Sequence, residues 1–180
     1  MMEYADQFEN IEFSAFGDTK ILTKTKLNQL CKIASTVGRN SSMSKYNQRF
    51  ILNHIELDCQ TKFSKLISSI YSFRQLWIWH CNFTFNGNLK IDESWSYALT
   101  SAFLSKLTFT SNAFKSLLKA FIHISKSTKF ELCLRSITIN TIDEYLTSLC
   151  NELSIPFEIT GNSVIYISAK LLVFDFENKL

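Results

Sequence analysis

The octapeptide LWIWHCNF, residues 76–83, contains the spacing on which most of the chain is built. Its aligned side chains fall at positions one, three, six and eight. Three other segments share that spacing, and a fourth, looser one shares its first three positions. The five copies begin at positions 55, 76, 107, 132 and 157 of the chain. Repeats of about 20–50 residues are typical of stacked arrays in which each unit pairs a strand with a helix. The spacing therefore predicts an α/β repeat protein.

Each copy predicts one strand with a core side and an outer side. The aligned residues are Leu76, Ile78, Cys81 and Phe83; Leu107, Phe109, Asn112 and Phe114; Leu132, Leu134, Ile137 and Ile139; Phe157, Ile159, Asn162 and Val164; and, less regularly, Ile55, Leu57, Gln60 and Phe63. Successive strand side chains point to opposite sides of a sheet. With Leu76 and Ile78 in the core, Trp77 and Trp79 are expected on the outer side.

The octapeptide resembles the strand segment of the leucine-rich repeat family, LxLxxN/CxL. Cys81, Asn112 and Asn162 stand where that family has an Asn or Cys that hydrogen-bonds the turn behind the strand. The stretch 132–160 looks most like the cysteine-containing, ribonuclease-inhibitor-like subtype. The resemblance covers about residues 50–164. It implies an α/β leucine-rich-repeat-like solenoid, with a parallel β-sheet on the concave side and α-helices on the convex side.

Three features depart from the family pattern. Ile137 and Gln60 replace the Asn or Cys, and the step from Leu76 to Leu107 is longer than one plain repeat. Residues 86–92, NGNLKID, have the composition of a turn-rich insertion and would account for the extra length.

The chain has the length of one domain. Residues 1–10 are predicted to be a flexible acidic tail and residues 11–180 a single repeat domain. Within that domain, residues 11–49 form a divergent N-terminal unit with a basic helix and loop, residues 50–164 the repeats, and residues 165–180 a C-terminal cap. Terminal units are expected to be atypical because they close the stack.

Apolar side chains at three- and four-residue steps predict the helices. They cover residues 24–37, with Gly38 as the stop, and then residues 63–70, 93–104, 114–122 and 142–153. The segments SVIYIS and LLVFDF lack a helical period and are predicted to be strands that close the last repeat.

Charge is unevenly distributed near the N-terminus. Residues 1–18 carry five acidic side chains and no basic one, whereas residues 19–49 carry seven basic ones and no acidic one. These basic residues are Lys20, Lys24, Lys26, Lys32, Arg39, Lys45 and Arg49. They form a candidate basic patch for RNA or another acidic partner. The plainer interpretation is a solvated helix face followed by a polar loop.

Five cysteines at irregular spacing indicate neither a disulfide framework nor a metal site. Reduced thiols in an intracellular, cytoplasmic protein are expected. The acidic N-terminus does not resemble a signal peptide, and no apolar stretch approaches the ~18 residues of a membrane span.

Motifs for catalysis or cofactor binding are absent from the sequence. The three histidines lack ligand spacing, and no glycine-rich phosphate loop or nucleophile motif is present. Although His80 adjoins Cys81, the two side chains are expected to diverge, with Cys81 turned inward. The protein is therefore predicted not to be an enzyme, with no cofactor, metal or small-molecule substrate.

These observations favour a non-catalytic protein–protein interaction or scaffold module, a subunit of a larger assembly. The predicted partner-binding residues are Trp77, Trp79, His80, Arg135 and Glu158. Tryptophan and arginine dominate binding hot spots. Two alternatives remain: residues 1–18 or the C-terminal tail could cover the tryptophans, or the protein could be RNA- or ribonucleoprotein-associated through Lys20–Arg49.

Overall fold

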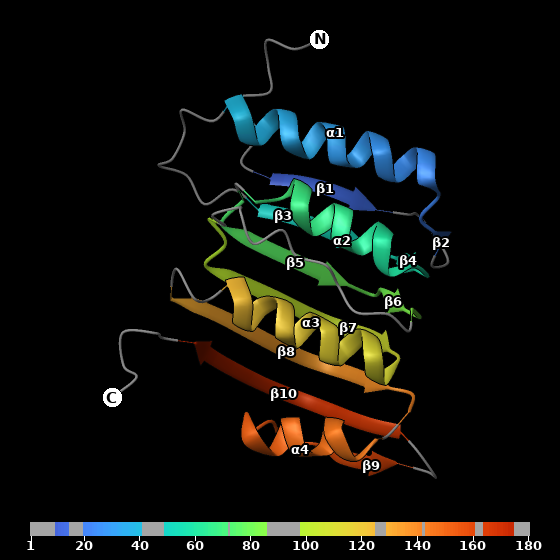
Figure 1. Cartoon of the computed structure of the whole chain (residues 1–180), viewed down its shortest axis with the longest axis vertical. Coiled ribbons are helices and arrows are strands. Elements are labelled where there is room, and N and C mark those ends of the chain that lie inside the picture. The colour runs from blue at the N-terminus through green and yellow to red at the C-terminus, as the bar shows by residue number, and fades with distance from the viewer. Residues whose placement is uncertain are drawn as a thin grey trace.

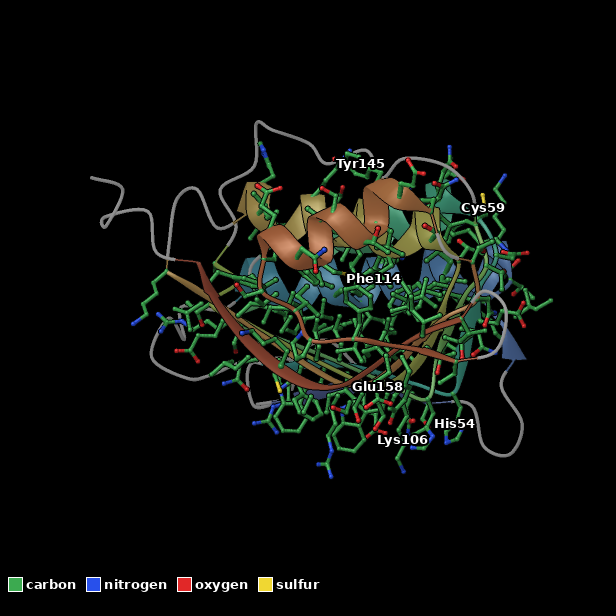
Figure 2. The ribbon with its side chains drawn as sticks, turned by 90° about the horizontal axis from the view of Figure 1, so that it is seen from below. His54, Cys59, Lys106, Phe114, Tyr145 and Glu158 are labelled. Carbon is green, nitrogen blue, oxygen red and sulfur yellow. The ribbon has the colours of Figure 1, made fainter. Side chains whose placement is uncertain are left out.

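The computed structural model describes residues 10–14, 20–40, 49–71, 73–85, 98–124, 129–141, 143–160 and 164–174. Within these ranges, ten strands form one sheet and four helices lie on one side of it (Figures 1 and 2). The fold is therefore α/β. None of the helices in these ranges is long and apolar enough to cross a membrane.

The strands are β1 (Asn10–Ser14), β2 (Lys20–Ile21), β3 (Arg49–Asn53), β4 (Ile55–Leu57), β5 (Gln75–Trp79), β6 (Asn82–Phe83), β7 (Ser101–Phe109), β8 (Phe130–Ile139), β9 (Glu158–Thr160) and β10 (Val164–Phe174). The helices are α1 (Lys24–Asn40), α2 (Gln60–Ser69), α3 (Ser111–Ile124) and α4 (Glu144–Glu152). Helix α1 continues past Gly38, so the expected stop at that residue was wrong.

The sheet is mixed. Strands β1, β3, β5, β7 and β8 pair in that order and are parallel. The short strands β2, β4 and β6 continue this arrangement and join the second half of β7. Strand β10 then pairs antiparallel with both β8 and β9.

The expectation of a purely parallel sheet was therefore wrong at its C-terminal end. Parallel neighbours need a crossover of a dozen or more residues, usually a helix. Only three residues separate β9 from β10, so the chain reverses direction between them. The predicted strand character of SVIYIS and LLVFDF is confirmed for their described residues, 164–168 and 171–174, which lie in β10.

Strand pairing corrects the register of the repeats. Phe50, Leu76, Ala102 and Leu132 are aligned across the sheet as successive register partners. The copies that begin at Leu76 and Leu132 were correctly placed, but those at Ile55 and Leu107 begin too late, since the true first positions are Phe50 and Ala102. The error has a simple cause: positions six and eight repeat the spacing of positions one and three. Alternation alone cannot distinguish the two pairs.

The corrected strand register also overturns several expected residue positions. Asn112 is exposed on α3, and Gln60 is the first residue of α2, so neither closes a strand. Ile159 is 58% exposed on β9, and Asn162 lies outside the described residues. The expected helix 93–104 is also wrong at its end, because Ser101 to Leu104 belong to β7. Residues 86–97, including the expected insertion, lie outside the described ranges.

The core lies between the sheet and the helices and is rich in phenylalanine. Phe83 stacks on Phe109 with ring centroids 4.7 Å apart, and Phe63 of α2 meets Phe83 edge-on at 5.1 Å. Cys81 is buried as expected. Its thiol donates to the carbonyl of Trp79 at 3.0 Å and accepts from the N–H of Ile55 at 3.4 Å.

Helix α4 is attached by its N-terminus and by its apolar stripe. The Asp143 carboxylate accepts from the Leu146 N–H at 2.7 Å, which caps the helix. The same carboxylate pairs with Lys115 of α3 at 2.6 Å. Leu146, Leu149 and Cys150 are buried, which confirms the middle of the predicted core stripe. Tyr145, which was also expected on that stripe, is 54% exposed, and Ile142 lies outside the described residues.

Candidate partner-binding surface

The side of the sheet opposite the helices is called the open face. Figure 2 shows the helices on one side, while His54, Lys106 and Glu158 project from the other. Along β3 and β5, buried residues alternate with partly exposed ones. The buried set faces the helices, so the partly exposed set forms the open face. In the described part of the chain, no helix covers this face.

Five apolar side chains line up in one row across the open face; beyond it, on β1, the exposed Glu12 is the register partner of Ile51. The members of the row are Ile51, Trp77, Phe103, Cys133 and Leu171, which are successive register partners on β3, β5, β7, β8 and β10. We call this the apolar row. None of its members is buried, and Leu171 is 56% exposed. Partial burial raises the pKa of the Cys133 thiol although Arg135 opposes the shift, so the thiol stays neutral at neutral pH.

Aromatic contacts make the middle of the row rigid. The Trp77 ring lies 5.4 Å from Phe103 and 5.5 Å from Trp79, centroid to centroid. The Arg49 guanidinium sits 3.8 Å from the centroid of the Trp77 ring, and its Nε donates to the Gln75 side chain at 3.0 Å. Such cation–π contacts contribute about 0.5–1 kcal/mol at exposed sites. The two tryptophans are therefore held in place before any partner arrives.

A column of residues with left-handed backbone lies next to the apolar row, separated from it by one set of register partners. His54, His80, Lys106 and Ser136 have φ between 49° and 56°. Each of them directly follows, in sequence, one of four residues that are register partners on neighbouring strands: Asn53, Trp79, Ser105 and Arg135. The left-handed turn puts two successive side chains on the open face before the next returns to the core. Consequently His54 and His80 stack with ring centroids 4.7 Å apart.

The two sides of the apolar row differ in charge. One side, the basic flank, consists of the set Asn53, Trp79, Ser105 and Arg135 and the left-handed column. It carries two positive charges, on the exposed Lys106 and Arg135, and no carboxylate. The other side, the mixed flank, consists of Arg49, Gln75, Ser101, Glu131 and Val173. Its charges cancel. Glu56 and Glu158 lie beyond the basic flank, on β4 and β9.

Three of the five predicted binding residues are brought together. Trp77, Trp79 and His80 are neighbours on the open face. Arg135 shares a register set with Trp79 two strands away. Glu158 lies farther off, because it pairs with Tyr166 of β10.

Four members of the row are not among the five predicted binding residues. Phe103 was assigned to a helix, and the alignment of Ile51, Cys133 and Leu171 with Trp77 was not visible in the sequence. The strand register alone reveals them. Repeats aligned on Phe50, Leu76 and Ala102 would have matched Trp77 with Ile51 on one side and Phe103 on the other.

The seven residues of the candidate basic patch do not share one described surface. Lys24, Lys26 and Lys32 are exposed on α1, on the helix side, whereas Arg49 contacts Trp77 on the open face. Lys45, and the side chains of Lys20 and Arg39, lie outside the described residues.

His80 gives the open face a pH dependence. Partial desolvation lowers its pKa, and the neighbouring Lys106 and His54 lower it further. The unfolded chain, with an ordinary His pKa of about 6.5, takes up its proton first. The contribution of His80 to stability is therefore lost as the pH falls below about 6.5.

We expect Lys106→Gln to raise the pKa of His80 and to reduce this loss of stability in acid. Imidazole NMR titration measures the pKa, and urea unfolding at two pH values measures the stability. Lys26→Gln on α1 is the matched control. If the His80 pKa is unchanged in Lys106→Gln, the charge of Lys106 does not contribute to the shift.

All five cysteines are free thiols in different environments. Burial raises the pKa of Cys81 to about 12 and that of Cys150 to about 11. Cys59 precedes α2, and hydrogen bonding by the Thr61 hydroxyl and the backbone lowers its pKa. Among the described residues, no three His, Cys, Asp or Glu side chains could share a metal ion.

We expect iodoacetamide to modify Cys59 well before Cys81 and Cys150, because the thiolate is the reactive form. Peptide mass spectrometry after timed quenching measures the order. Thr61→Val should slow the reaction at Cys59. Equal modification rates at Cys59 and Cys81 in the folded protein would contradict the difference in thiol pKa between these two residues.

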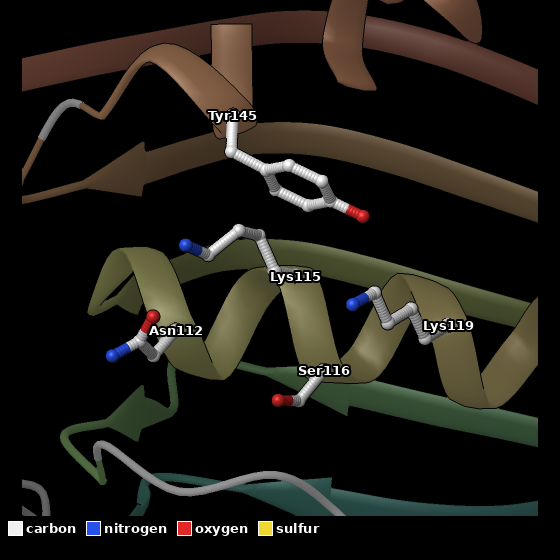
Figure 3. Close-up of a pocket in the computed structure, with 5 residues that line it drawn as sticks. All are labelled: Asn112, Lys115, Ser116, Lys119 and Tyr145. Carbon is white, nitrogen blue, oxygen red and sulfur yellow. The ribbon is translucent and has the colours of Figure 1, made fainter. Parts of the chain in front are cut away.

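A pocket of about 250 Å³ lies between α3 and α4 on the helix side (Figure 3). It is lined by Asn112, Lys115, Ser116, Lys119 and Tyr145. The ammonium groups of Lys115 and Lys119 lie 5.5 and 5.1 Å from the Tyr145 ring centroid. Lys115 is already engaged by Asp143, so these contacts serve to attach α4 to α3.

Comparison with known proteins identifies no relative of this chain. No protein-family model matches the chain, and no curated protein or solved structure shows significant similarity to it.

Proposed function

We propose that this protein is a non-catalytic interaction module of leucine-rich-repeat type that binds another protein through its open face, as a subunit of a larger assembly. The observation that carries the proposal is the apolar row. Folding alone gives no reason to place five apolar side chains in line on the side of the sheet that none of the described helices covers. Contiguous exposed apolar surface on a soluble domain commonly marks an interaction site.

The middle of the row has the properties of a binding anchor. Trp77 and Trp79 present large rigid surfaces that lose little conformational entropy when buried. Arg49 stacks on Trp77, and arginine and tryptophan are both enriched at hot spots. A partner that covers these side chains would remove aromatic surface from water without first having to order it.

Two features support the repeat-type architecture. The strands β3, β5, β7 and β8 lie side by side in one register, with Phe50, Leu76, Ala102 and Leu132 at the same level. Cys81 contacts backbone groups next to its strand, as the corresponding residue does in the leucine-rich repeat. In a stacked architecture of this kind, the apolar face of each unit is covered by its neighbours.

Site-specific photocrosslinking tests the proposal. A photoreactive residue replaces Ser105, which lies on the open face between Trp79 and Arg135. The control position is Ser148, which is exposed on α4. We expect a protein to be crosslinked from position 105 and not from position 148. Equal crosslinking from both positions, or none from position 105, would refute the proposal.

RNA binding through α1 is the competing proposal, and the exposed Lys24, Lys26 and Lys32 are what favour it. It predicts affinity for single-stranded RNA that falls steeply with salt, because phosphate contacts release counterions. Binding through the apolar row predicts a much shallower salt dependence, because apolar burial supplies most of the affinity.

A further inference from the structure

We infer that the partner segment on the open face is an amphipathic α-helix, which lies across the strands with its apolar stripe on the apolar row and acidic side chains over the basic flank. This inference rests on the proposed function and specifies the partner.

The chemistry of the row favours a helix over an extended segment. Its five side chains offer neither carbonyls nor carboxylates, and the sheet backbone beneath them is already paired between strands. An extended segment laid across them would bury its own N–H and C=O groups without partners. Each such group costs about 1–3 kcal/mol. A helix satisfies these groups internally and presents only side chains.

The dimensions also fit a helix. The row spans five strands, or four strand spacings of about 4.8 Å, which is about 19 Å. A helix rises about 1.5 Å per residue, so about 13 residues would cover the row. That is close to the usual length of a helix in a globular protein.

The width of the row matches a narrow apolar stripe. Polar side chains border it at most positions: Gln75 and Ser101 on one side, and Asn53 and Ser105 on the other. Trp79 and Val173 widen it locally. An amphipathic helix presents a comparable stripe at positions i, i+3, i+4 and i+7. A broad apolar partner surface would instead bury these polar groups.

The charge difference between the flanks sets the orientation. Lys106 and Arg135 are exposed on the basic flank, over β7 and β8, whereas Arg49 and Glu131 cancel on the mixed flank. Charge complementarity steers association and fixes register. The side of the helix that lies over Lys106 and Arg135 is therefore acidic.

Designed peptides test both parts of the inference. The probe is a fluorescein-labelled, alanine-based helix of about 18 residues, long enough to be helical in water. It carries a leucine stripe with glutamates along one flank. A second peptide carries lysines in place of the glutamates, and a third has the first sequence scrambled. Fluorescence anisotropy gives the dissociation constants. We expect the glutamate peptide to bind at least about tenfold more tightly than the others, a difference of about 1.4 kcal/mol.

A charge reversal provides the matched variants. Lys106→Glu/Arg135→Glu should reverse the preference, so that the lysine peptide binds more tightly. Lys24→Glu/Lys26→Glu adds the same charge on the helix side and should change nothing. If the first pair melts early, Arg135→Glu alone is tested, and it should at least halve the preference. Equal binding of the glutamate and scrambled peptides, or no binding at about 100 µM, overturns the helix. An unchanged preference in a folded Lys106→Glu/Arg135→Glu variant overturns the assigned flank.

Crosslink spacing separates this inference from the proposed function. Photoreactive residues at positions 51 and 171 mark the two ends of the row. In a captured partner, a helix places the two crosslinked residues about 13 apart, whereas an extended segment places them about 6 apart. The shorter spacing would refute the helix and leave the protein-binding function standing. Absence of crosslinking from position 105 would refute the function itself.

Discussion

Replacing Phe83 with alanine is expected to lower the free energy of unfolding by about 3–5 kcal/mol. The side chain is fully buried and packs on three other rings. It stacks on Phe109 at 4.7 Å and meets Phe63 edge-on at 5.1 Å, and Phe85 lies 6.5 Å away. Removing the ring leaves a cavity that strands on both sides and helix α2 would have to close. Urea unfolding followed by circular dichroism measures the effect.

Phe103→Ala is the matched control, since Phe103 is in the same sheet but on the open face. Its ring is partly exposed already, so its removal creates no closed cavity. We expect a loss well below half of that for Phe83→Ala. Equal losses would mean that the open face is packed as tightly as the core, and the distinction between the two faces would fail.

Alternation of apolar residues predicted most of the strands, and apolar residues at three- and four-residue steps predicted most of the helices. The first part of β7, Ser101 to Leu104, was assigned to a helix. Alternation placed Leu76, Ile78 and Cys81 in the core, whereas the position of the helices on one side of the sheet was implied by the resemblance to the leucine-rich repeat. Alternation could not determine which apolar pair begins each repeat, because the pattern fits equally well when the second pair is taken for the first. Hydrogen bonding to neighbouring strands decides this, and no single strand contains that information.

The antiparallel end of the sheet was beyond local reasoning for a similar reason. Strand character in β10 follows from its composition. Its direction depends on the short connection from β9, which reverses the chain. A resemblance to a parallel repeat gave no warning of this reversal.

The candidate site was predicted in part. The two tryptophans follow from strand alternation alone, but the apolar row requires the register between strands. The left-handed column could not be predicted from residue type. Its members are two histidines, a lysine and a serine, where glycine or asparagine would have signalled φ > 0. Histidine is enriched at such positions, but too weakly to identify one.

The double variant Trp77→Ala/Trp79→Ala is expected to weaken binding of the crosslinked partner, or of the glutamate peptide, by at least about 2 kcal/mol, or some 30-fold. Both rings lie at the centre of the open face and contact Phe103. Their truncation removes the widest part of the apolar row and leaves Arg49 without its stacking partner. We expect a large effect because residues that anchor an interface cluster near its centre, and both tryptophans lie at the centre of the open face.

The melting temperature decides how this loss is interpreted. Both side chains are only partly buried and support no core residue above them, so we expect a small change in melting temperature. Tyr145→Ala is the control, because it removes an exposed aromatic ring from the helix side. It should leave binding unchanged. A large fall in melting temperature with binding retained would mean that the tryptophans pack against other parts of the same chain. The open face would then be a second core surface, and the binding site would have to lie elsewhere.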